Sequence, residues 1–213
     1  MIATLIGGTG LTGSFLLRQL LADAAISRVI SVSRKPLELA DPKLTQVLLS
    51  DLAQLPALAE KMRGELYFCC LGTTIKAAGS KQNFEKVDHA AIVAFAQIAR
   101  THQARSLTLV SAMGANPGSM VFYNQVKGRT EDDVKALGLR SLIIFRPALL
   151  NGPRRDFRLA EKIVARTLVP LSRLLPDRTR KSLITEAETL AARMLAQGKA
   201  APAGVLVILA KDI

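Results

Sequence analysis

Tyr123 and Lys127 are the side chains in this sequence whose types and spacing best suit proton transfer. Because they lie four residues apart, a helix would place both on one face. A phenol with a pKa of about 10 is a poor acid or base at neutral pH, but a nearby ammonium lowers that pKa by stabilising the phenolate. Ser111, at the end of a predicted strand, could hold a substrate carbonyl oxygen beside the tyrosine. The alternative is an ordinary Tyr–Lys contact on a helix surface.

A glycine-rich run separates the first predicted strand from the first predicted helix, and it reads Gly7, Gly8, Thr9, Gly10, Leu11, Thr12, Gly13. Glycines in this position allow a tight turn and let backbone N–H groups and the positive end of the helix approach a pyrophosphate. The last glycine allows the helix to pack closely on the strand. The run therefore predicts dinucleotide binding, and the alternative is a turn that only connects two elements.

The end of the second predicted strand carries Ser33, Arg34 and Lys35, and no acid occurs between Asp23 and Glu38. A nicotinamide cofactor without a 2′-phosphate usually meets a carboxylate at this place. A carboxylate would repel a 2′-phosphate, whereas a guanidinium binds one through two hydrogen bonds. The sequence therefore favours NADP(H) over NAD(H), against the alternative that these are two solvated charges on a loop.

Two further strand ends supply candidate cofactor contacts. Asp51 and Leu52 follow the third predicted strand, where the carboxylate could meet an adenine edge and the leucine could cover the ring. Asp51 is equally suited to cap a helix that begins near Leu55. A second group, Leu71, Gly72 and Thr73, ends the fourth strand beside the expected ribose, although it also suits an ordinary strand-ending turn.

The elements that must position these residues alternate between short apolar runs and longer helical patterns. Predicted strands cover residues 1–6, 28–32, 44–49, 65–71, 106–110, 139–145 and 205–209. Predicted helices cover residues 14–22, 83–102, 122–137, 154–175 with a break at Pro170, and 185–197. This alternation predicts an α/β fold with a doubly wound, mostly parallel sheet of the Rossmann type. We expect one domain over residues 1–213, with a small C-terminal helical cap that includes residues 151–182 as the substrate region.

These residues resemble the short-chain dehydrogenases/reductases, in particular the atypical members with a Gly-x-x-Gly-x-x-Gly turn. The matching residues are Gly7, Gly10 and Gly13 in the turn, Ser111, Tyr123 and Lys127 in the catalytic set, and Arg146 and Pro147 beside the nicotinamide. The run 110–116 together with residues 123–128 is most similar to the Tat-interacting-protein-like subgroup. The resemblance covers nearly the whole chain.

The resemblance implies NADP(H) bound across the strand ends, with Tyr123 as proton donor, Lys127 orienting the ribose and Ser111 polarising the carbonyl. One position departs from the family, because Asp88 stands where its helix asparagine supports a proton relay. We therefore expect a reductase of a carbonyl-type small molecule. The alternative is an NADP(H)-responsive regulatory or scaffold protein with little catalysis, since several relatives in the subgroup have regulatory roles.

The charge of the chain is consistent with phosphate recognition. The 213 residues carry a formal charge of +12, and residues 151–182, with nine basic and three acidic side chains, contribute half of it. No nucleic-acid motif accompanies this charge, so we expect a small-molecule substrate or an acidic protein partner and no nucleic acid. We expect a monomer or a homodimer.

Several other classes are not expected from the sequence. No uncharged apolar run reaches the roughly 20 residues of a membrane span. The two histidines lack Cys or acidic neighbours at ligand spacing, so no metal site is expected. Cys69 and Cys70 are adjacent and cannot form an ordinary disulfide, and together with an N-terminus that reads as structure they predict a cytoplasmic protein.

Overall fold

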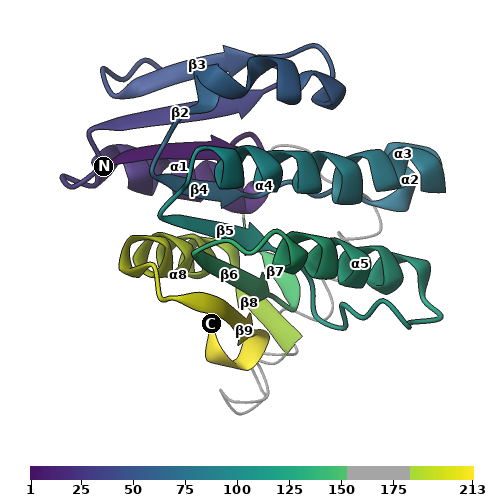
Figure 1. The fold of residues 1–213 in the computed structure, drawn as a ribbon. Helices are drawn as coiled ribbons and strands as arrows, with labels where there is room; N and C mark the ends of the chain where they lie inside the picture. The colour runs from purple at the N-terminus through teal and green to yellow at the C-terminus, as the bar shows by residue number, and fades with distance from the viewer. Residues whose placement is uncertain (153–182) are drawn as a thin grey trace.

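The computed structural model describes residues 1–152 and 183–213, and within them a seven-stranded parallel sheet forms the centre of the molecule (Figure 1). The strands follow the order β3-β2-β1-β4-β5-β6-β9. Successive strands are therefore added to one side of β1 up to β3 and to its other side from β4 onward. The strands are β1 (Ile2–Ile6), β2 (Arg28–Ser33), β3 (Leu44–Leu48), β4 (Leu66–Cys69), β5 (Ser106–Val110), β6 (Ser141–Arg146) and β9 (Gly204–Leu209). This arrangement confirms the predicted doubly wound α/β sheet. Residues 153–182, where most of the cap was predicted, lie outside the described residues.

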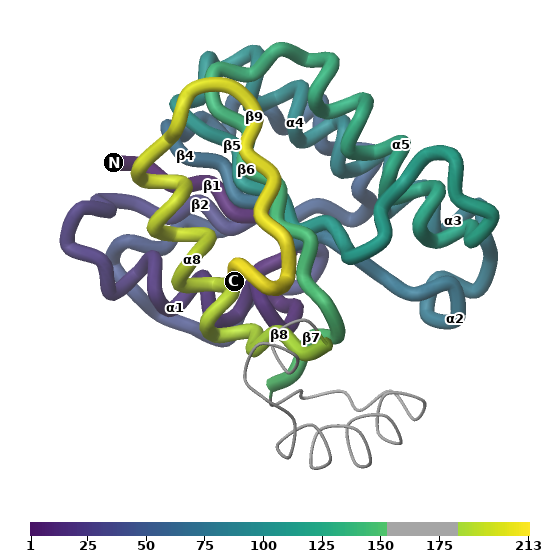
Figure 2. Tube along the Cα trace, turned by 90° about the horizontal axis from the view of Figure 1, so that it is seen from below, coloured from purple at the N-terminus to yellow at the C-terminus, as the bar shows by residue number. Residues whose placement is uncertain are grey.

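Helices cover both faces of the sheet (Figure 2). On one face, α1 (Leu11–Ala22) lies beside α8 (Ala187–Ala200), and their leucines share a buried cluster with the strands. On the other face, α4 (Ala91–Thr101) and α5 (Phe122–Ala136) close a second cluster. Because every central strand is buried on both sides, the strands consist of nearly continuous apolar runs.

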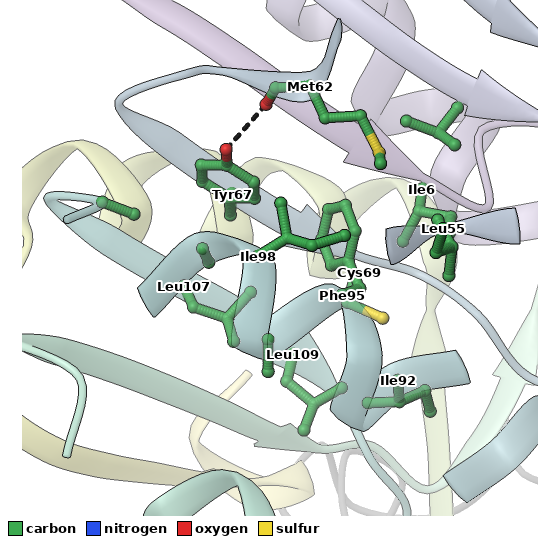
Figure 3. Packing of buried hydrophobic residues seen from close by; sticks show 14 of the residues in the cluster. Ile6, Leu55, Met62, Tyr67, Cys69, Ile92, Phe95, Ile98, Leu107 and Leu109 are labelled. Carbon is green, nitrogen blue, oxygen red and sulfur yellow. Dashed lines mark hydrogen bonds between the residues drawn. The ribbon is translucent and has the colours of Figure 1, made fainter. Parts of the chain in front are cut away.

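The second cluster contains Tyr67, one of the two tyrosines in the chain. Tyr67, on β4, is fully buried against Phe95, and its hydroxyl donates a hydrogen bond of 2.6 Å to the Met62 carbonyl oxygen (Figure 3). The same hydroxyl lies 2.6 Å from His102 Nδ1, and burial raises the pKa of Tyr67 to about 12. Tyr67 is therefore part of the core, and it is not available for acid–base chemistry at neutral pH.

The predicted helix 83–102 consists of three segments. These are α3 (Lys81–Glu85), one wide π turn (Lys86–Ala90) and α4. A π turn inserts an extra residue and so changes the carbonyl pairing of a helix. The Asp88 carbonyl oxygen accepts a hydrogen bond of 2.8 Å from the Thr130 hydroxyl on α5. The turn thus fixes Asp88 against α5.

Short elements complete the described chain. They are η1 (Leu52–Gln54), η2 (Pro56–Met62), α2 (Ile75–Ala78), β7 (Leu149–Asn151), β8 (Ile184–Glu186) and η4 (Ala210–Asp212). Strands β7 and β8 pair in parallel and form a small second sheet. The predicted helix 185–197 begins at Ala187 instead, because the residues before it belong to β8.

Candidate functional site

The glycine turn joins β1 to α1 at the switch point of the sheet, where ligands bind in open α/β folds. Gly7 has φ +85°, and the Gly10 N–H donates to its carbonyl oxygen over 3.0 Å. A Cβ atom at Gly13 would lie 2.1 Å from the Gly7 carbonyl oxygen. A Cβ atom at Gly7 would lie 2.6 Å from the Cys70 backbone after β4. The turn is therefore as close to its neighbours as a glycine backbone allows.

The N-terminus of α1 is open for an anion. Gly10 stands at the N-cap, no side chain caps the helix, and its first turn contains no acid. Thr9 is exposed and Leu11 is half-buried, whereas Gly8 and Thr12 are buried. The first N–H groups of a helix lack partners within it, and with the helix dipole they favour a phosphate at this position. The turn thus fits the pyrophosphate of a dinucleotide.

The end of β2 lies next to this turn, as the NADP(H) prediction requires. A Cβ atom at Gly8 would lie 3.2 Å from Ser31 Oγ on β2. Beyond it, the Ser33 hydroxyl donates to the Lys35 carbonyl oxygen over 2.7 Å, and Arg34 and Lys35 are exposed. Both cations are thus free to turn toward a bound phosphate, although a preference for NADP(H) stays a prediction.

Asp51 has the second of its two predicted roles. Its carboxylate accepts the Ala53 N–H over 2.8 Å and caps η1, and the Gln54 side chain completes the capping box. Leu52 is half-buried against the core cluster. The helix that Asp51 caps begins at Leu52, three residues before the position predicted. The adenine contact of Asp51 and Leu52 stays a prediction.

Lys127 is buried and forms an ion pair of 2.8 Å with the fully buried Asp88 carboxylate. The other carboxylate oxygen of Asp88 accepts the Thr73 N–H over 2.8 Å. Burial by itself would lower the pKa of Lys127, but the charge of Asp88, together with Tyr123 and the hydrogen bond to Asp88, raises it. Lys127 is therefore a charged ammonium within the site, and Asp88 is its direct partner.

The residues after β4 connect the glycine turn to this ion pair. Gly7 touches the backbone at Cys70 and Leu71, and a Cβ atom at Gly72 would lie 3.6 Å from Asp88 Oδ1 and 3.9 Å from Lys127 Nζ. Thr73 is held by the same carboxylate. The segment 70–73 therefore has the phosphate turn on one side and the ammonium on the other, which is the place predicted for the ribose.

Tyr123 lies one helical turn before Lys127 on α5. It is half-buried, and its ring packs on Phe84 with centroids 5.6 Å apart. Tyr123 is also, after Asp88, one of the groups that raise the pKa of Lys127. The structure therefore brings together the Tyr–Lys pair that the sequence predicted.

Ser111 has a partner that the sequence did not predict. Its hydroxyl donates a hydrogen bond of 2.6 Å to Glu131, which is buried and is held through both oxygens by Arg146 at 2.9 and 2.6 Å. Glu131 follows Lys127 by four residues, so the helical spacing that pairs Tyr123 with Lys127 also places Glu131 on that face. This spacing was the available signal.

Pro147 lies beside the serine. The pairing of β5 with β6 continues past the strand ends, because the Ser111 N–H donates to the Phe145 carbonyl oxygen over 2.7 Å. The Pro147 carbonyl oxygen then accepts the Met113 N–H over 2.9 Å, and Pro147 itself is buried. Its predicted place near the catalytic set is thus adjacent to Ser111, and its contact with a nicotinamide stays a prediction.

Neither a metal site nor a membrane-spanning helix occurs in the described part of the chain. Within residues 1–152 and 183–213, no cluster of His, Cys, Asp and Glu has the arrangement of a metal site. No helix in this described part is long and apolar enough to span a membrane. Cys69 is buried, Cys70 is half-buried, and both are unpaired thiols whose pKa is raised by burial.

The fold and the glycine turn define a Rossmann-type dinucleotide-binding protein. In agreement, residues 7–169 match the family described as NAD(P)H-binding. The chain belongs to this family, which supports a nicotinamide dinucleotide as its cofactor.

The chain is also similar to named fungal relatives and to solved structures. The chain is 37% identical to Protein fmp52, mitochondrial, of Aspergillus fumigatus over 163 residues, which cover 74% of this chain and 70% of the relative. It is 39% identical to the protein of the same name from Aspergillus clavatus, over 75% of this chain and 71% of the relative. A crystal structure of DesIV, a dTDP-glucose 4,6-dehydratase from Streptomyces venezuelae with NAD bound, has a TM-score of 0.72 and 19% identity. That match covers 98% of this chain and 76% of DesIV and shows the shared fold.

The relatives correct one expectation from the sequence. Both fungal proteins are named mitochondrial, so the predicted cytoplasmic location is wrong. The prediction depended on an N-terminus that reads as structure and on unpaired cysteines. Unpaired cysteines indicate a reducing environment and do not distinguish the cytoplasm from other reducing compartments.

Proposed function

We propose that this protein is an NADP(H)-dependent reductase of a carbonyl-type small molecule. The observation that carries the proposal is the placement of the glycine turn and the buried Lys127 on two sides of segment 70–73, with Tyr123 one turn from the lysine. A dinucleotide lying across the strand ends from the turn to Lys127 would place its nicotinamide half near the tyrosine. We also propose that the protein belongs to the Tat-interacting-protein-like subgroup, which its sequence resembles.

The residues that would hold the cofactor fit its chemistry. The turn from Gly7 to Gly13 and the uncapped start of α1 suit the pyrophosphate. Arg34 and Lys35 suit a 2′-phosphate, because both are exposed beside the turn and no acid occurs between Asp23 and Glu38. Lys127, adjacent to Gly72, suits the ribose hydroxyls. When bound, the cofactor supplies the hydride.

The protein's own residues would supply the proton and the electrostatic setting. Tyr123 would donate its phenolic proton to the oxygen of the carbonyl group as that oxygen gains negative charge. Lys127 would stabilise the phenolate that remains, and Asp88 keeps the lysine charged and fixed in place. Glu131 acts on Ser111, whose hydroxyl donates to its carboxylate.

The substitution Tyr123→Phe tests the assignment. We expect reduction of a carbonyl substrate to fall by about 10²-fold or more, because the proton donor is lost, while NADPH binds as tightly as before. Turnover is followed as loss of NADPH absorbance with a panel of aldehydes, ketones and quinones, and binding is followed by calorimetric titration. A variant that reduces the same compound as fast as the wild-type protein would contradict the mechanism.

A second candidate function is an NADP(H)-responsive regulatory protein. The Asp88–Lys127 ion pair favours it, because the carboxylate offsets the lysine charge that would otherwise promote phenolate formation. In that case the affinity for an acidic partner would change with the cofactor. Titration of a candidate partner with and without NADPH tests this, and identical affinities would exclude it.

A further inference from the structure

The hydroxyl group of Ser111 has a single proton, and Glu131 accepts it. The oxygen atoms lie 2.6 Å apart, and Ser111 and Glu131 are 6% and 1% exposed. A carboxylate that is held through both oxygens by arginine is ionised and can only accept hydrogen bonds. The hydrogen bond between Ser111 and Glu131 therefore has the serine as its donor.

Arg146 makes this arrangement rigid. Its Nε and Nη2 atoms hold the two oxygens of Glu131 at 2.9 and 2.6 Å, and this hydrogen-bonded pair raises the pKa of Arg146. Lys135 Nζ lies 3.6 Å from Oε2 of Glu131, the oxygen that Arg146 Nη2 also holds, and adds a second positive charge there. Glu131 is thus fixed in place by groups that favour its ionised form.

We infer that Glu131 is a positioning residue that retains the Ser111 proton, so that Ser111 meets a substrate as a hydrogen-bond acceptor. The inference rests on the proposed reductase function, and it changes the expected role of Ser111. A carbonyl oxygen can only accept, so it would depend on Tyr123 for a proton and gain little from Ser111. A carbonyl compound that carries a hydroxyl group beside its reacting carbon could donate to Ser111. The site therefore selects hydroxycarbonyl compounds over plain ketones.

The first test needs no substrate. Ser111→Cys places a thiol against the same carboxylate, which disfavours the thiolate, and Ser111→Cys/Glu131→Gln keeps the shape and removes the negative charge. We expect iodoacetamide at pH 8 to alkylate position 111 at least about 10-fold faster in the double variant, corresponding to a pKa difference of about one unit. Peptide mapping by mass spectrometry measures the rate, and the buried Cys69 is the internal control for intact folding. Equal rates at position 111, including no reaction in either variant, would overturn the inference.

A loss of folding in the double variant would be visible as alkylation of Cys69. In that case the pH midpoint for alkylation of the single variant Ser111→Cys tests the inference. A midpoint above about 8.5, the ordinary value for cysteine, supports the inference, and a midpoint below it contradicts the inference.

The second test measures substrate choice with a matched pair of probes, butan-2-one and 3-hydroxybutan-2-one. We expect the wild-type protein to favour the hydroxyketone in kcat/KM by about 10-fold, the value of one hydrogen bond. In Glu131→Gln the amide can donate to Ser111 and free its proton, so the preference should fall to about 1. If Glu131 had a purely structural role, Glu131→Gln would lower kcat/KM for both ketones by the same factor and leave the preference for the hydroxyketone unchanged. That result would contradict the inference. If the wild-type protein reduces no carbonyl compound, the proposed function fails while the alkylation result still decides the role of Glu131.

Discussion

At the scale of single residues, the buried charge of Lys127 dominates the site. An ammonium with 5% of its side chain exposed is stable only with a partner, and the fully buried Asp88 provides one at 2.8 Å. In the family that the sequence resembles, this position carries asparagine. The aspartate therefore changes both the charge around Tyr123 and the stability of the protein.

The substitution Asp88→Asn should change how stability depends on pH. In the wild-type protein the pKa of Lys127 is raised on folding, so its contribution is complete below the unfolded value of about 10.4 and is lost only as the pH rises through the folded value. Without Asp88, burial dominates and the folded pKa falls below 10.4. Stability of the variant is then about 3 kcal/mol lower near pH 7 and increases as the pH rises toward 10.

Urea denaturation from pH 7 to pH 10 measures this difference. The gap between the free energies of unfolding of the wild-type protein and Asp88→Asn should narrow as the pH rises. Parallel curves would show that Asp88 does not determine the charge state of Lys127.

Arg34 is the residue for which cofactor choice is most easily tested. Arg34→Ala should weaken NADPH binding by about 10-fold and leave NADH binding unchanged, because only NADPH carries the 2′-phosphate that the guanidinium would contact. Arg28→Ala, at the opposite end of β2 and also exposed, is the matched control for loss of one positive charge. Calorimetric titration gives both affinities, and equal losses for NADPH and NADH would contradict the assignment.

At the scale of elements, the close contact between α1 and β1 permits the phosphate site. Gly13→Ala should lower stability by about 1–3 kcal/mol and weaken NADPH binding, because its Cβ would lie 2.1 Å from the Gly7 carbonyl oxygen and displace the helix. Gly72→Ala is the matched variant, since its Cβ meets only Asp88 and Lys127 at 3.6 and 3.9 Å. We expect Gly72→Ala to keep the melting temperature and lose NADPH affinity, because the methyl group would stand in the ribose position. Thermal unfolding and titration of both variants separate these effects, and unchanged NADPH affinity in Gly72→Ala would exclude a ribose there.

The helices and strands differ in how far the sequence could predict them. Short apolar runs predicted every strand of the main sheet, and burial on both faces gives the central strands the clearest signal, whereas the edge strands β3 and β9 are largely exposed. The π turn around Asp88 was not predicted, since it depends on Thr73 and Thr130, which approach only after folding. Strands β7 and β8 were not predicted either, because each has three residues and a partner distant in the sequence.

At the scale of the whole molecule, candidate residues from six strand ends lie at one edge of the sheet. The parallel order β3-β2-β1-β4-β5-β6 places residues that follow these strands on that edge, so local patterns and topology together predicted a candidate site there. Glu131 was not predicted as a site residue. It lies on α5, and its contacts are with Ser111 and Arg146 at the ends of β5 and β6, which approach it only in the folded protein. Half of the +12 charge lies in residues 151–182, of which 153–182 lie outside the described residues.

The most direct measurement is transfer of the label from NADPH carrying deuterium at the reactive carbon of the nicotinamide. The protein is incubated with labelled NADPH and the carbonyl panel, and the products are analysed by mass spectrometry. The account predicts an alcohol with deuterium on the former carbonyl carbon, formed by the wild-type protein and reduced by about 10²-fold or more in Tyr123→Phe. Bound NADPH that transfers no deuterium to any member of the panel would contradict the proposed reductase.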